Sequence, residues 1–126
     1  MKKVYFLQTC DTCRRILKEV NTANFELQEV KANPVNVPQL EEMYAFTKSY
    51  EALFNRRAKL YKEMDLKNQT LSETDYRQLI LDDYTFLKRP VFIVDDEIFV
   101  GNSKNVIEDL KKKISTITPY KQQIIK

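Results

Sequence analysis

The chain has 126 residues, of which 43% are hydrophobic, 11% aromatic and 31% charged, and this is the composition of one globular domain and not of a disordered chain. It contains no histidine, two cysteines and one glycine, which excludes histidine-dependent catalysis, a four-thiolate zinc site and a glycine-rich phosphate-binding loop. The formal net charge is +3, and five lysines but no acid follow residue 110, so the body of the domain is nearly neutral and does not predict direct binding to nucleic acid.

The N-terminal part of the chain predicts a β-α-β unit. Residues 4–7 are a β-branched and aromatic run typical of a strand, and from residue 13 the apolar side chains recur at helical spacing. Residues 25–30 alternate apolar and polar side chains, the pattern of a half-buried strand. No signal-peptide pattern precedes the first strand, and the longest apolar runs, about four residues, are far shorter than the roughly 20 of a membrane span. We therefore expect a cytoplasmic protein without a membrane segment.

A helical insert is predicted over about residues 36–87. Asn36 suits a helix N-cap, and Pro38 is tolerated in the first turn that follows it. Further along, residues 72–75 form a capping-box pattern that begins another helix, with apolar side chains at helical spacing as far as Leu87. The middle of the chain is therefore expected to be helical throughout.

A β-hairpin is predicted after Arg89-Pro90. Residues 91–94 and 98–100 are apolar runs separated by a turn. We interpret Asp95 and Asp96 as turn residues and not as a carboxylate pair for acid-base catalysis.

The last helix is predicted to begin after the N-cap Ser103 and to run to Ile114, with lysines 111–113 in its final turn. The elements then follow in the order β-α-β, helical insert, β-β-α. This order predicts an α/β fold with a four-stranded mixed sheet and an α-helical insert lobe. We expect a single domain over residues 1–115, followed by a C-terminal tail over residues 116–126.

The strongest chemical feature is the motif Cys10-Asp11-Thr12-Cys13, at the junction of the first strand and the first helix. Thiols of such motifs at helix N-termini form thiolates readily. Cys10 is therefore the expected nucleophile, and Cys13, one turn into the helix, the thiol that resolves by closing a disulfide with it. Two alternatives stay open: a pair of ordinary small buried side chains, or two ligands of a metal site shared across a dimer.

Two further features are basic. Arg89-Pro90 directly precedes a strand, where proline is sterically allowed. Residues 55–59 contain Arg56, Arg57 and Lys59, which form either a solvated helix face or a site where an arginine binds an oxyanion or a carboxylate.

Together these features resemble the arsenate reductase (ArsC)/Spx family of thioredoxin-like proteins. That family has a cysteine site after the first strand, an Asn-x-Arg stretch before an aromatic-containing helix, an Arg-Pro pair before the third strand and a short final helix. The matching segments here are Cys10 with Cys13, residues 55–57 followed by 61–64, residues 89–92, and residues 101–103 leading into the last helix.

The resemblance implies a thioredoxin-like fold with a cis Pro90 opposite the Cys10 loop. It also implies Cys10 as a nucleophile that attacks a small oxyanion such as arsenate, and Arg89 as an arginine of the site, with either Arg56 or Arg57 as the second. Thr12, inside the Cys10 loop, and Pro90 join these arginines as expected substrate-binding residues. Glutathione or another thiol reductant, with glutaredoxin or thioredoxin as partner, would supply electrons, and neither a bound cofactor nor a metal is expected.

The sequence combines features of two branches. Arsenate reductases of this family carry a third arginine near the start of the final helix, where this chain has Gly101-Asn102. The Cys10/Cys13 pair is similar to the Spx branch, whose members are redox-sensing regulators that bind the RNA polymerase alpha subunit. Spx carries a glycine where an ungapped comparison places Ser49. An arsenate reductase-like thiol oxidoreductase and an Spx-like regulator are thus the two predicted functions.

Overall fold

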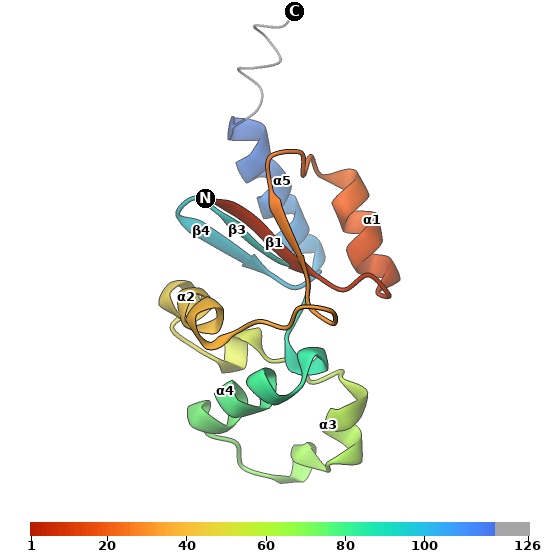
Figure 1. Ribbon diagram of the computed structural model, residues 1–126, viewed down its shortest axis with the longest axis vertical. Coiled ribbons are helices and arrows are strands. Elements are labelled where there is room, and N and C mark those ends of the chain that lie inside the picture. Colours follow the sequence, from red (N-terminus) through yellow and green to blue (C-terminus); the bar gives the residue numbers. More distant parts are fainter. Residues whose placement is uncertain (118–126) are drawn as a thin grey trace, which may run out of the picture. The chain divides into compact units, whose positions relative to one another are not determined.

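The structure of the protein is a computed structural model that describes residues 1–117. The chain divides into two compact units: residues 1–28 with the described residues from 89 onward, and residues 29–88 (Figure 1). The first unit is built on the sheet and contains β1 (Lys2–Phe6), α1 (Asp11–Glu19), β3 (Val91–Val94), β4 (Glu97–Val100), α5 (Lys104–Ile117) and all of β2 (Glu26–Glu29) except its last residue.

The sheet has the strand order β2-β1-β3-β4, with β3 antiparallel to both β1 and β4. In Figure 1 the dark red β1 lies beside the cyan β3, although the two strands are at opposite ends of the sequence. Val4 pairs with Phe92, and Phe92 pairs with Phe99. Directly paired residues point to the same face of a sheet, so these three side chains form one apolar row.

That row is the centre of the core of the first unit. Helices α1 and α5 both pack on this face: Ile16 of α1, Leu110 and Ile114 of α5, and Val20, the C-cap of α1, belong to the same buried cluster. The predicted α/β fold with a four-stranded mixed sheet is confirmed.

Strand β2 is present as predicted, but Leu27, its apolar residue, does not lie in the core as the alternation of apolar and polar side chains had indicated. Leu27 is 52% exposed, whereas Gln28 is only 7% exposed. Phe25 precedes the strand and packs edge-to-face on Phe92, with ring centroids 5.7 Å apart. Because β2 is an edge strand, Leu27 can lie exposed while Phe25, just outside the strand, contributes to the core.

The second unit is helical. It contains α2 (Val37–Thr47), α3 (Lys59–Glu63) and α4 (Glu73–Asp82), with short 3-10 helices at Glu51–Leu53, Leu66–Asn68 and Tyr84–Phe86. Both predicted helix starts are confirmed, since Asn36 and Ser72 each form a complete capping box. The buried Phe54 ring stacks on Phe86 at 5.2 Å and lies 4.9 Å from the ring of Tyr76.

The helix predicted to reach Leu87 instead ends at Asp82. The Asp83 carboxylate accepts a hydrogen bond from the backbone N–H of Thr85 at 2.9 Å and begins a 3-10 turn there. A side chain that captures a backbone N–H in this way competes with continuation of the helix.

Helix α5 begins as predicted, because the Ser103 hydroxyl accepts the Val106 N–H at 3.3 Å. It continues to Ile117, so lysines 111–113 precede its last turn, contrary to the prediction. Lys113 instead pairs with Asp96 (3.1 Å) and Glu97 (3.0 Å) in the hairpin. Of the predicted tail, residues 116 and 117 belong to this helix, and residues 118–126 lie outside the described residues.

The Asp95-Asp96 turn interpretation agrees with the hairpin, in which Asp95 adopts a left-handed φ of 55°. None of the helices described in residues 1–117 is long and apolar enough to cross a membrane.

Candidate functional site

Cys10 is the N-cap of α1. Its backbone N–H donates to the Leu7 carbonyl at 3.1 Å, and its own carbonyl accepts the Arg14 N–H at 3.1 Å. Its Sγ accepts the backbone N–H of Cys13 at 3.4 Å, so the sulfur takes the place that a serine or aspartate oxygen usually has at a helix start. The half-buried Cys10 sulfur thus lies at the positive end of the helix.

Cys13 lies one turn further along, with no exposed surface. Burial raises the pKa of the Cys13 thiol to about 12, and Cys10 adds to the rise, while the Leu7 backbone and the charge of Arg89 oppose it. Both cysteines are free thiols. At neutral pH Cys13 is therefore protonated and shielded from solvent, whereas Cys10 is partly accessible.

Arg89 and Pro90 belong to the same unit as the cysteines. The Arg89-Pro90 peptide bond is cis, which confirms the isomer that the family resemblance implied. Pro90 is buried, and Arg89 is half-buried with its Nε shielded from solvent. The Pro90 carbonyl accepts the N–H of Gly101 at 2.9 Å, and the Arg89 carbonyl accepts from the Asn102 side chain at 3.5 Å. Gly101-Asn102 thus holds the backbone of the Arg89-Pro90 pair.

The first turn of α1 also carries an ion pair that the sequence analysis missed. Arg14 pairs with Asp11, the residue that directly follows Cys10. Opposite charges three residues apart on a helix are a recognisable signal, and this spacing could have identified the pair. Thr12, in the same turn, is half-buried.

Arg56 and Arg57 belong to the other unit, residues 29–88. Arg56 is already engaged there: its guanidinium pairs with Glu51 at 2.5 Å and donates to the Tyr76 hydroxyl at 3.0 Å. Arg57 is exposed, and no hydrogen bond or ion pair of its guanidinium occurs among the residues that the structure describes. Of the two side chains, the Arg57 guanidinium is therefore the more available to bind another group.

Asn55, in front of these arginines, has a structural role. Its backbone N–H donates to the Phe86 carbonyl at 2.7 Å and its side chain to the Thr85 carbonyl at 3.0 Å. Its Oδ1 accepts the Arg57 N–H at 3.0 Å. Asn55 thereby ties the arginine segment to the chain just before Arg89.

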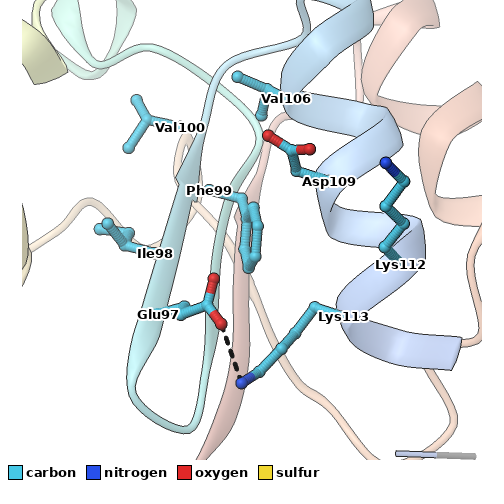
Figure 2. A pocket seen from close by; sticks show the side chains of 8 residues that line it. All are labelled: Glu97, Ile98, Phe99, Val100, Val106, Asp109, Lys112 and Lys113. Carbon is cyan, nitrogen blue, oxygen red and sulfur yellow. Dashed lines mark ion pairs between the residues drawn. The ribbon is translucent and has the colours of Figure 1, made fainter. Parts of the chain in front are cut away.

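A surface hollow of about 560 Å³ lies between edge strand β4 and helix α5. Figure 2 shows Phe99 at its centre and Lys113 reaching across to Glu97 at one end. None of the predicted site residues lines it. Within residues 1–117, no group of three or more potential ligands is placed to hold a metal ion.

The model of the ArsC family matches residues 5–110. The chain belongs to the ArsC family. Among its relatives, the global transcriptional regulator Spx of Lactiplantibacillus plantarum is 23% identical over 124 residues, which cover 95% of this chain and 94% of that protein.

Solved ArsC-family structures show the same fold. A protein from Bacteroides fragilis described as related to the ArsC family has a TM-score of 0.72 at 21% identity, covering 87% of this chain and 97% of the other. Arsenate reductase from Vibrio cholerae has a TM-score of 0.67 at 17% identity, covering 90% and 96%. Family membership and the thioredoxin-like fold are thus confirmed, while the roles of the individual site residues stay predictions.

Proposed function

We propose that this ArsC-family protein is a thiol-dependent oxidoreductase in which Cys10 attacks the substrate and Cys13 resolves the intermediate. The observation that carries the proposal is the arrangement of the two thiols: the Cys10 sulfur accepts the Cys13 N–H at the start of α1, and Cys13 lies buried one turn behind it. A partly accessible first thiol and a shielded second thiol suit two successive sulfur displacements.

With a disulfide substrate, the Cys10 thiolate attacks one sulfur, forms a mixed disulfide and releases the first thiolate. Cys13 then attacks the Cys10 sulfur, closes the Cys10–Cys13 disulfide and releases the second thiol, while the departing group takes the Cys13 proton. The two cysteines lose two electrons, and the substrate disulfide gains them.

With arsenate, the Cys10 thiolate forms a bond to arsenic as water leaves. Attack by Cys13 on the Cys10 sulfur then breaks the sulfur–arsenic bond, and its electron pair remains on arsenic, which departs as arsenite. The same Cys10–Cys13 disulfide results. Glutathione, or a glutaredoxin or thioredoxin partner, returns the protein to its dithiol form by a further thiol–disulfide exchange.

Arg89 is the proposed anion-orienting residue of the sheet unit. Its charge favours the ionised form of Cys13 and so opposes the rise in the pKa of that thiol that burial causes. Of the two insert arginines, Arg57 is the better second candidate, because Glu51 and Tyr76 occupy the guanidinium of Arg56. A planar guanidinium can bind two oxygens of an oxyanion at once.

The test is substrate-dependent NADPH oxidation, measured with arsenate and with a small disulfide. The reaction is coupled in parallel to glutaredoxin with glutathione and to thioredoxin with its reductase. Turnover should disappear in Cys10→Ser, and in Cys13→Ser it should survive only where an external thiol can resolve the intermediate. Full turnover in Cys10→Ser would contradict the proposal.

The second candidate function is that of an Spx-like regulator. In such a protein, closure of the Cys10–Cys13 disulfide would change a protein-binding surface. The favouring observation is that Spx of Lactiplantibacillus plantarum aligns over nearly the whole of both chains. This function predicts that the protein binds the RNA polymerase alpha subunit, with a dependence on redox state. A pull-down with the purified alpha subunit under reducing and oxidising conditions tests it, with Cys10→Ser as the reduced-state control, and binding in neither condition would exclude it.

A further inference from the structure

The charges around Cys10 are arranged unusually for a site that would receive an anion. Asp11, the first residue of α1, directly follows the proposed nucleophile, and its side chain is 89% exposed. Arg14 lies three residues further along, is 46% exposed and forms an ion pair with Asp11. The backbone N–H of Arg14 donates to the Cys10 carbonyl, so both charged residues belong to the same turn as the sulfur.

Asp11 has two effects on an approaching anion. The N-terminus of a helix attracts negative charge, and the Asp11 carboxylate supplies that charge from within the chain. The same carboxylate holds Arg14, a guanidinium that could otherwise bind the anion. The next arginine, Arg15, pairs with Glu19 at the other end of the helix at 3.5 Å.

We infer that Asp11 makes Cys10 selective for the charge of its substrate: the Asp11 carboxylate disfavours anionic substrates and favours neutral or cationic disulfides. This inference rests on the proposed role of Cys10 as nucleophile and narrows the substrate class of that site. Arg89 is the other arginine proposed for this site. It is half-buried, and its charge lowers the pKa of the buried Cys13 thiol. The sequence contains no arginine after Arg89 that could compensate.

The size of the effect follows from Coulomb's law. Two unit charges about one helical turn, ~5 Å, apart interact by about 0.8 kcal/mol in a water-like medium. Removal of the Asp11 charge therefore changes the rate at which a singly charged group reacts by about fourfold. Release of Arg14 from its partner acts in the same direction. Salt screens both effects, because the charges are exposed.

The experiment compares three disulfide probes in a Cys13→Ser background, where only Cys10 can react. The probes are 5,5′-dithiobis(2-nitrobenzoate), which is anionic, 4,4′-dithiodipyridine, which is neutral, and cystamine, which is cationic. In each reaction the Cys10 thiolate forms a mixed disulfide and one thiolate leaves, so no external oxidant or reductant is needed. The readout is the ratio of the rate constants for the anionic and the neutral probe, since a change in the thiolate fraction of Cys10 cancels in that ratio.

At low salt, Asp11→Asn should raise the anionic-to-neutral ratio by about fourfold or more and lower the cationic-to-neutral ratio. Asp11→Glu, which keeps the charge, should leave both ratios near those of the parent. Arg14→Gln should move them in the opposite direction from Asp11→Asn, and the Asp11→Asn/Arg14→Gln double variant should return toward the parent. High salt should reduce all of these differences.

Two results would overturn the inference. If Cys10 reacts with all three probes but Asp11→Asn leaves the ratios unchanged at low salt, Asp11 does not select substrate charge and the proposed function still stands. If Cys10 in the folded protein reacts with none of the probes, the proposed nucleophile and the inference fail together. Both substituted side chains are exposed, and far-ultraviolet circular dichroism verifies that each variant is folded.

Discussion

Alkylation should distinguish the two cysteines through the burial of Cys13. Burial raises the pKa of this thiol from 9.0 to about 12. Each pKa unit above the ambient pH costs a factor of ten in thiolate, so at about pH 8 Cys13 has roughly 1,000-fold less thiolate than an ordinary cysteine. In Cys10→Ser, where Cys13 is the only thiol, iodoacetamide should react more than tenfold and up to about 1,000-fold more slowly with the folded protein than with the protein in concentrated denaturant. Replacement of Cys10 removes the part of the Cys13 pKa rise that Cys10 causes, but it leaves burial, which is the largest cause of that rise.

The assay follows the intact mass of the protein over time after addition of iodoacetamide. Cys13→Ser, which retains only Cys10, is the matched control and should react in the folded state. The rate for Cys13 should also keep rising about tenfold per pH unit beyond pH 9, where an ordinary thiol reaches a plateau. A folded-state rate for Cys13 within tenfold of its denatured-state rate would refute the argument from burial.

Three further predictions concern stability. Because the pKa of Cys13 in the folded state lies above its unfolded value of 9.0, its contribution to stability is complete below about pH 9. The contribution is lost as the pH rises toward 12, by about 4 kcal/mol in total. In urea unfolding under reducing conditions, stability should therefore fall more steeply over this range in wild type than in Cys13→Ala. Phe92→Ala should lower the free energy of unfolding by about 3–5 kcal/mol, because this buried ring contacts both neighbouring strands and Phe25, and a loss under 1 kcal/mol in urea titration would contradict the assigned core. Arg56→Gln should lower the melting temperature through loss of the Glu51 and Tyr76 contacts, whereas Arg57→Gln should leave it unchanged; equal effects of the two substitutions in differential scanning fluorimetry would be inconsistent with this division of roles.

Local sequence signals predicted much of the fold. Asn36 and Ser72 start helices because their side chains bond to N–H groups only three residues away, an interaction that needs no tertiary contact. The hairpin followed equally from two apolar runs and a turn. The position of Cys10 at the start of α1 could be predicted for the same reason, since the change from strand to helical periodicity is visible within a few residues.

Other features depend on residues that are distant in sequence. The exposure of Leu27 and the burial of Gln28 depend on which segments cover the two faces of β2, and periodicity does not reveal this. The commitment of Arg56 to Tyr76, 20 residues away, distinguished it from Arg57 where the sequence left either possible. The pKa of Cys13 is raised by desolvation and is partly lowered again by the charge of Arg89, which folding brings to the site from 76 residues along the chain.

The sequence by itself determined the order of the elements, the helix caps and the family motif, because each rests on side-chain periodicity or on bonds within one turn of chain. The tertiary structure alone decided which face of β2 is buried, which of the insert arginines is already paired and how strongly Cys13 holds its proton. These properties depend on solvent exclusion and on electrostatic fields, and both arise only when distant segments pack together.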